Sequence, residues 1–181
     1  MQKKQIMKNF IYLFLAIAFI FSSCTKEEGC TDSLATNFNV DAENDDGSCV
    51  YGVVGGEWIT QSIEMTGSMT VSLGGFPLLD STINYIETNP DSLDPYKLVF
   101  SENNSYVSYD NSNNPVEGGT WSSSGNQLTM NTPDTTLVLT INSLNRDNVS
   151  LSLNIAESTT DDMGVSIDYD ITQTVNSDRT W

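Results

Sequence analysis

Apolar and polar residues alternate along much of the chain after residue 56. Strict alternation over four to eight residues is typical of a strand with one face buried and the other in water. It is clearest over residues 149–155 and 165–171. Further strands are predicted over residues 57–73, 96–100, 105–109, 119–122, 127–130 and 137–141. No stretch after residue 30 keeps a helical period over three turns, so the pattern predicts an all-β fold.

Short segments rich in Asn, Asp, Ser, Gly and Pro separate the predicted strands. They lie at residues 102–105, 111–115, 124–126, 133–134 and 145–148. Such residues form tight turns, and consecutive strands joined by tight turns form an antiparallel up-and-down meander. Closing that meander into a barrel removes its exposed edges. We therefore expect a barrel of about eight to ten strands over residues 52–181, interrupted over residues 74–94 by a lid or merely a loop.

The first 23 residues have the layout of a targeting segment. Three lysines and no acid precede an apolar run over residues 10–21, which is too short to span a bilayer. Two serines then precede Cys24. This arrangement resembles the lipobox of bacterial lipoproteins, although Phe21 stands where leucine is commoner. The resemblance implies that residues 1–23 are a signal peptide and that Cys24 carries acyl chains such as palmitate, which anchor the chain in a membrane.

Residues 24–28 are expected to form a tether after the lipid anchor. Lys26, Glu27 and Glu28 follow Cys24 closely. A lysine with two acids at this place resembles the surface-export signal of lipoproteins in one large phylum of Gram-negative bacteria. The resemblance implies an outer-membrane lipoprotein exposed at the cell surface. The alternative is a solvated charged tether with no signalling role.

Residues 29–51 contain Gly-Cys-Thr-Asp near their start and Asp-Asp-Gly-Ser-Cys near their end. They closely resemble a short module of secreted and surface proteins in the same phylum. A segment this short cannot build a core, and a Cys30–Cys49 disulfide would stabilise it by about 3 kcal/mol through loop closure. Cys24 is then the third, unpaired cysteine, as lipidation requires.

This cysteine-bounded module is dense in oxygen donors. The acids proposed as ligands are Asp32, Asp41, Asp45 and Asp46. The chain has no histidine, so a metal here would be a hard cation, most plausibly Ca²⁺. The EF-hand spacing is not met, because counting back from Gly47 places Ala42 at the first ligand position. The alternative is an acidic spacer without metal, and no other cofactor is expected.

The predicted strands carry an ordered set of motifs. Gly56-Glu57-Trp58 opens the first strand, and Gly118-Gly119-Thr120-Trp121 lies further along. Together with residues 97–106 this order resembles the lipocalin-like domains of surface and periplasmic lipoproteins. The resemblance implies that Trp58 packs across the closed end of the barrel beside Gly56, and that Gly119 and Trp121 are structural too.

The lipocalin resemblance also implies a function. It predicts a small apolar or amphipathic ligand inside the barrel, whose contacting residues the sequence does not identify. The alternative is a non-catalytic structural or interaction module at the cell surface, with a filled barrel and no ligand.

Charge and the missing histidine exclude other functions. After Cys24 the chain carries four cations against 24 acids, so its net charge is −20. Such a charge repels nucleic acid. Without histidine the usual general base and zinc ligand are absent, and we expect no enzyme.

Four hydroxyl residues follow an aspartate and precede an apolar residue or threonine: Ser33, Ser81, Ser92 and Thr135. This resembles the O-glycosylation acceptor pattern of exported proteins in the same phylum, and all four are expected in loops or turns. The alternative is that these dipeptides are simply good turn formers.

Overall fold

The computed structural model describes residues 26–181. The predicted signal peptide and Cys24 lie outside these residues. The described chain divides into two compact units, residues 26–33 with 37–49 and residues 34–36 with 50–181. Residues 26–181 contain no helix, hence none of the length and hydrophobicity that crossing a membrane requires.

The smaller unit is built around the predicted disulfide. Cys30 and Cys49 are bonded, and Cys30 is buried. Strand β1 (Glu28–Gly29) pairs in parallel with β2 (Asn44–Asp45). Beyond these two short strands the unit consists of turns and irregular segments, and its one large aromatic side chain among the described residues, Phe38, is 43% exposed. The disulfide therefore replaces an apolar core in this unit.

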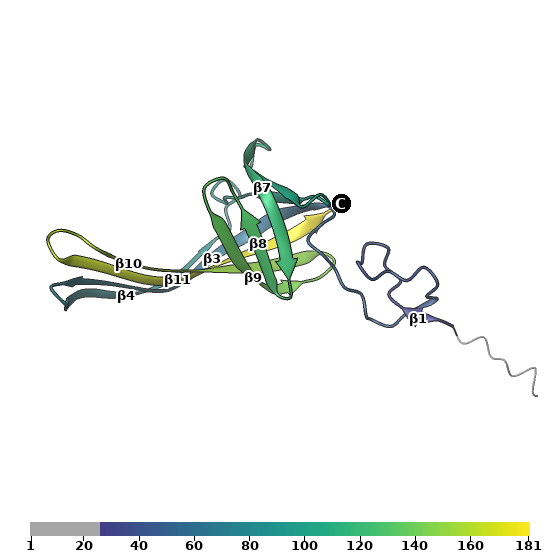
Figure 1. The fold of residues 1–181 in the computed structure, drawn as a ribbon, viewed down its shortest axis with the longest axis horizontal. Coiled ribbons are helices and arrows are strands. Elements are labelled where there is room, and N and C mark those ends of the chain that lie inside the picture. Colours follow the sequence, from purple (N-terminus) through teal and green to yellow (C-terminus); the bar gives the residue numbers. More distant parts are fainter. Residues whose placement is uncertain (1–25) are drawn as a thin grey trace, which may run out of the picture. The chain divides into compact units, whose positions relative to one another are not determined.

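The larger unit is a closed antiparallel barrel, which confirms the predicted lipocalin-like fold class (Figure 1). Eight strands form the ring: β3 (Glu57–Leu73), β5 (Lys97–Phe100), β6 (Ser105–Tyr109), β7 (Pro115–Ser124), β8 (Gln127–Asn131), β9 (Thr136–Leu144), β10 (Asn148–Thr160) and β11 (Val165–Thr180). Neighbours in sequence pair in order, and β11 closes the ring by pairing with β3 from Glu57↔Thr180 onward.

The inward residues of the barrel strands form the core. Trp58, Tyr106 and Leu128 are at most 2% exposed, and Leu98, Phe100 and Leu151 pack with them. These residues follow the alternation that predicted the strands, since β6 and β8 bury every second side chain. Core formation thus explains the period-two pattern.

A ninth strand, β4 (Phe76–Glu87), lies outside the ring and corrects the expectation of a loop or lid over residues 74–94. It forms a hairpin with β3, from Leu73↔Phe76 to Ile63↔Glu87. Pro77 lies within this strand, and β4 pairs only with β3. Proline is tolerated on such an edge, where no partner needs its missing N–H.

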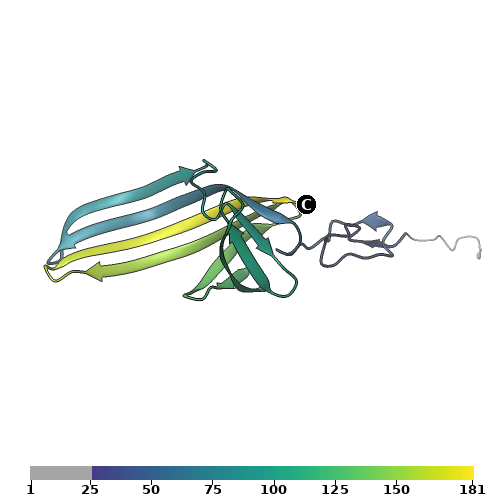
Figure 2. The same cartoon turned by 90° about the horizontal axis from the view of Figure 1, so that it is seen from above.

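Four strands continue past the barrel and form an extended sheet in the order β4-β3-β11-β10 (Figures 1 and 2). We call this sheet the β-arm. It comprises residues 63–73, 76–87, 155–160 and 165–172. The barrel neighbours stop short of it, since β5 pairs with β3 only at Trp58 and Ile59, and β9 pairs with β10 only as far as Ser152.

Candidate functional site

The interior of the barrel contains a cavity of about 410 Å³. Cavities that hold small ligands begin at roughly 300 Å³, so this one is large enough. Most of its lining is aliphatic or thioether side chain from six different strands. These residues are Leu98, Val116, Met130, Leu137, Leu139, Leu151, Leu153 and Val175. The barrel is therefore not filled by its own side chains.

The cavity lies between the closed end of the barrel and the base of the β-arm. Leu153 and Gln173 line it and pair with each other across β10 and β11. Two residues further out, Ile155 pairs with Ile171 on the β-arm. Because side chains two apart on a strand share a face, the apolar lining continues onto one face of the β-arm.

One buried hydroxyl points to polar recognition inside the cavity. Tyr106 lines the cavity and is 2% exposed, yet its hydroxyl oxygen has no hydrogen-bond partner within residues 26–181. Burial raises the pKa of Tyr106, and the negative charge of Glu117 raises it further. The phenol therefore stays neutral and keeps a proton to donate. Leaving such a group unpaired costs about 1–3 kcal/mol, which a ligand acceptor would recover.

The charged residues of the lining are all acidic. Asp94 and Glu117 line the cavity, and no lysine or arginine does. Ser108 also lines the cavity, and its hydroxyl donates a hydrogen bond to the Glu117 carbonyl and accepts one from the Glu117 N–H. The cavity therefore disfavours an anionic head group and favours a neutral or cationic one.

Trp58 and Arg179 form the opposite end of the barrel. The Arg179 guanidinium lies 4.0 Å from the centroid of the Trp58 ring and 4.9 Å from that of Trp181. It donates a hydrogen bond to the backbone carbonyl of Gly52, while the Trp58 indole donates to that of Val53 at 2.7 Å. Burial lowers the pKa of Arg179 below its ordinary value. This cation–π stack lies away from the cavity lining.

The four residues named from the lipocalin resemblance lie at close contacts. At Gly56, φ is +74°, and a Cβ would lie 2.4 Å from the carbonyl oxygen of Thr180. At Gly119 it would lie 1.9 Å from that of Asn131. The Trp121 ring packs edge-on against Phe100, with 5.7 Å between centroids. None of Gly56, Trp58, Gly119 and Trp121 lines the cavity, so all four serve packing.

Sequence reasoning missed Tyr106 and Arg179. Tyr106 lies in a strand that alternates as any barrel strand does, and nothing in that pattern distinguishes a core tyrosine from one facing a cavity. Arg179 carried a usable signal, because it is one of only two arginines in the chain and occupies a strand position that alternation assigns to the interior.

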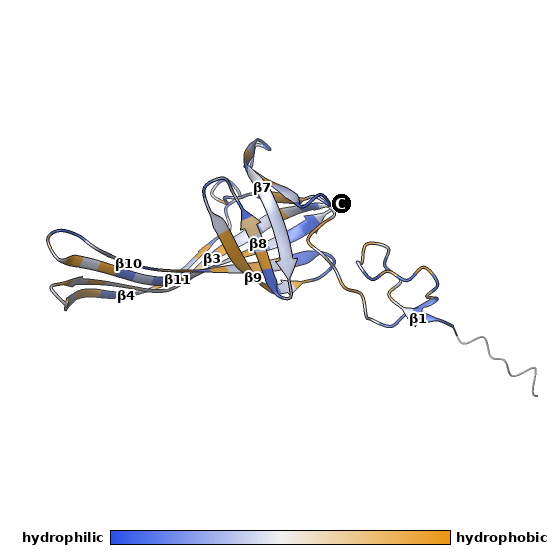
Figure 3. Cartoon of the chain, in the orientation of Figure 1, coloured by the Kyte–Doolittle hydropathy of each residue, from blue (hydrophilic) through white to orange (hydrophobic). Residues whose placement is uncertain are grey.

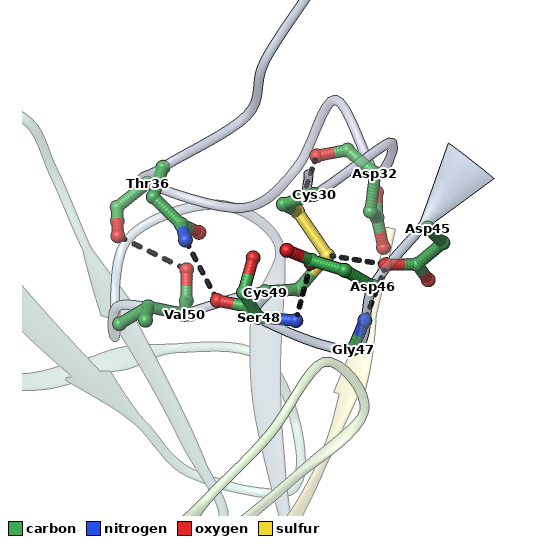
Figure 4. The surroundings of a disulfide bond; sticks show 10 residues. Cys30, Asp32, Thr36, Asp45, Asp46, Gly47, Ser48, Cys49 and Val50 are labelled. Atoms are coloured by element: carbon green, nitrogen blue, oxygen red, sulfur yellow. Dashed lines mark hydrogen bonds between the residues drawn. A yellow bond between two sulfur atoms is a disulfide. The ribbon is translucent and has the colours of Figure 1, made fainter. Parts of the chain in front are cut away.

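Three of the four proposed metal ligands, Asp32, Asp45 and Asp46, lie near the disulfide of the cysteine-bounded module (Figure 4). Within residues 26–181, no group of three or more carboxylate or cysteine side chains is placed to hold a metal ion. Asp45 and Asp46 instead accept hydrogen bonds from the backbone N–H groups of Gly47 and Ser48, at 3.0 and 2.9 Å. Two of the four acids, Asp45 and Asp46, therefore fix the turn before Cys49. A Ca²⁺ site at Asp32, Asp41, Asp45 and Asp46 stays a prediction.

The remaining predicted sites lie at the surface. Lys26, Glu27 and Glu28 are exposed, and Lys26 forms an ion pair with Glu43 at 3.8 Å. Ser33, Ser92 and Thr135 lie in turns or loops, as expected for glycan acceptors. Ser81 does not, because it lies within β4 and pairs with Met69.

The fold and the cavity define a closed antiparallel barrel whose largely apolar chamber is lined by Tyr106, a residue with an unpartnered buried hydroxyl. The sequence matches no protein-family model and no curated protein, and the structure matches no solved structure.

Proposed function

We propose that the protein binds a small amphipathic ligand inside its barrel. The observation that carries the proposal is the 410 Å³ cavity with its apolar lining and the unpartnered Tyr106 hydroxyl. The apolar part of the ligand occupies the aliphatic interior, and a hydrogen-bond acceptor on it meets Tyr106. Because Asp94 and Glu117 are the only charges in the lining, the head group is neutral or cationic.

Ligand binding is tested with a fluorescent apolar dye, N-phenyl-1-naphthylamine, and twelve-carbon competitors. Dodecanol and dodecyltrimethylammonium should displace the dye at lower concentration than dodecanoate, because only the carboxylate adds a negative charge beside Asp94 and Glu117. Tyr106→Phe should weaken dodecanol binding about fivefold, the equivalent of one hydrogen bond, and leave the dye unaffected.

A matched pair of variants locates the site. Leu139 lines the cavity, so the larger side chain of Leu139→Trp should occupy much of its volume. We expect the affinity for the dye to fall by about tenfold or more. Val138 is the next residue on β9, is 48% exposed and points outward, so Val138→Trp should leave affinity unchanged. The absence of saturable dye binding, or an equal loss in both variants, would refute an interior site.

We also propose that the protein is a lipid-anchored lipoprotein of the outer membrane, exposed at the cell surface. The N-terminal pattern before Cys24 supports the anchor, and Lys26, Glu27 and Glu28 support export. Cys24→Ala should leave an unprocessed precursor without acyl chains, measured by mass spectrometry. Replacing Lys26, Glu27 and Glu28 with alanine should protect the chain from protease added to intact cells.

The absence of histidine supports a non-catalytic role. The cavity holds two carboxylates but no nucleophile paired with a base, since Ser108 hydrogen-bonds to the backbone. The alternative function as an interaction module draws support from a different part of the molecule, the β-arm.

A further inference from the structure

Hydrophobic and hydrophilic residues both occur along the strands of the β-arm (Figure 3), and alternation along a strand places them on opposite faces of the sheet. Its central strands β3 and β11 place only apolar residues and one glycine on one face between residues 63 and 73 and between 165 and 171, by their register. This apolar face includes Met65, Met69, Val71, Ile167, Tyr169 and Ile171.

The opposite face of the β-arm is polar. On the same two strands it carries Ser68, Thr70, Asp168 and Asp170. Asp168 and Asp170 accept hydrogen bonds from Ser158 and Asn154 of β10. The polar side chains of this face can remain hydrated, whereas the side chains of the apolar face gain free energy when they are removed from water.

The apolar face is substantially exposed. Ile167 is 38% exposed, and on β4, Leu79 and Tyr85 are 48% and 49% exposed. Near the tip of the β-arm, Phe76 is 77% exposed and Met163 is 78% exposed. Contiguous apolar surface on this scale is unusual for a monomer and marks a binding surface.

We propose that two copies of this chain pack through the apolar faces of their β-arms, as a two-layer β-sandwich. Stacked sheets lie about 10 Å apart and bury the side chains of their facing sides between them. In a single copy no second sheet covers the apolar face of the β-arm, and a second copy would supply one. In a dimer with a two-fold axis, the same surface of each copy forms the interface. An apolar surface can pack against a second copy of itself, because it needs no partner of opposite charge.

The area of the face is sufficient for a stable dimer. Four strands about 4.8 Å apart and about ten residues long, at about 3.3 Å per residue, give roughly 600 Å² per copy. Two copies then bury roughly 1,200 Å², which is the lower end of the range for stable, specific interfaces. Flexible Met65 and Met69 at the centre can adapt to the opposing side chains.

The distribution of charge permits this contact despite the net charge of the chain. The acids that β3 and β11 carry within the β-arm all point to the polar face, so the centre of the contact between the two copies contains no acidic side chain. On the apolar face, Glu87 and Glu157 lie only on the outer strands β4 and β10. Tyr85 and Tyr169 donate hydrogen bonds to them at 2.5 and 2.6 Å. The result is an apolar centre with a polar rim, as in protein interfaces generally.

A membrane or a single ligand fits the apolar face less well. The outer edge of β4 and the outer edge of β10 beyond Ser152 carry unpaired backbone groups, and burying those groups in hydrocarbon costs several kcal/mol each. A sandwich leaves both edges in water. One acyl chain would cover a single strip of a sheet that is roughly 19 Å wide.

The test uses the full chain in intact cells, with two differently tagged copies produced together. A photo-crosslinking phenylalanine derivative replaces Tyr169 on the apolar face of one copy. In a matched control it replaces Asp170, the next residue, on the polar face. We expect a crosslinked product that carries both tags and has twice the mass of one copy, from position 169 and not from position 170.

Variants of the unmodified copy then test the face itself. Met69→Asp should lower the yield of crosslinked dimer from position 169 about tenfold, because it places a charge in the apolar contact. Thr70→Asp adds the same charge on the polar face and should leave the yield unchanged. Protease resistance of the barrel checks that both variants are folded, and the comparison of positions 169 and 170 needs neither variant.

The other outcomes overturn the proposal. Crosslinks at position 169 only to lipid would assign the face to a membrane, and crosslinks only to a different protein would assign it to another partner. Equal dimer yields from positions 169 and 170, or a dimer indifferent to Met69→Asp, would place the contact between copies elsewhere. The absence of any crosslinked product from position 169 would show that the face stays uncovered.

Discussion

Gly119→Ala should destabilise the barrel strongly, because the new methyl group has no room. A Cβ at position 119 would lie 1.9 Å from the carbonyl oxygen of Asn131 on β8 and 3.1 Å from the Tyr106 ring. Ordinary contact begins at 3.4 Å, so β7 and β8 must separate by about 1.5 Å at this point. A separation of that size stretches a backbone hydrogen bond beyond its working range.

The expected cost follows from two effects. Overpacking costs about 1–3 kcal/mol, and one or two broken backbone hydrogen bonds cost about 1 kcal/mol each, so we expect a loss of about 2–5 kcal/mol in the free energy of unfolding. For a chain of this size that corresponds to a decrease in Tm of about 4–20 °C. Urea unfolding followed by tryptophan fluorescence measures the loss, since all three tryptophans lie in the barrel unit.

Gly118→Ala is the matched control. A Cβ at position 118 would lie 3.2 Å from the backbone oxygen of Tyr106, so a shift of a few tenths of an ångström accommodates it. We expect a change within about 0.5 kcal/mol of the original chain, because reduced freedom of the unfolded chain offsets the small strain. A Gly119→Ala chain as stable as the original, or equal losses in both variants, would refute the reasoning.

Four further predictions concern other parts of the molecule. Arg179→Lys should lower the free energy of unfolding by about 1–2 kcal/mol and alter tryptophan fluorescence, because an ammonium cannot stack as a plane on Trp58. Burial and the charge of Glu117 raise the pKa of Tyr106. The stability that this neutral phenol contributes is therefore fully present below its ordinary pKa and is lost as pH rises through the folded-state pKa. Tyr106→Phe should reduce the loss of stability at alkaline pH, measured by urea unfolding. Cys49→Ser should expose Glu43 to a glutamate-specific protease, because the module lacks another core. Intact mass of the protein from its native host should show glycans that vanish in alanine variants of the turn residues and persist in Ser81→Ala.

The barrel could be predicted because its strands bury every second residue. Val149, Leu151 and Leu153 alternate with polar residues in the sequence, and β10 buries Val149 and Leu151 and half-buries Leu153. β4 could not be predicted in the same way, since Phe76-Pro77-Leu78-Leu79 is a continuous apolar run containing a proline. Its pairing depends on β3 continuing past the barrel. The local sequence does not indicate how many residues a strand extends beyond the strands that neighbour it in the sheet.

The candidate site was less predictable than the fold. A barrel strand has the same alternating sequence whether its inward side chains meet at the centre or leave a chamber. Met130 and Leu139 face the cavity, whereas Leu128, two residues from Met130 on the same strand, is completely buried in the core. The difference arises from the summed volumes of eight strands, which are set by tertiary packing. The sequence also did not predict that Asp45 and Asp46 would accept hydrogen bonds from the N–H groups of Gly47 and Ser48.

The pairing of β3 with β11 determines when the barrel can form. The ring closes between Glu57 and Thr180, so the first strand of the ring cannot complete its pairing before the last strand is present. The cation–π stack on Trp58 likewise requires Arg179. Contacts this distant in sequence make folding slow. Synthesis from the N-terminus adds β11 after every other strand, and until then β3 lacks one of its two barrel neighbours. The export that we propose would benefit from this delay, because the barrel cannot close until its final strand has arrived.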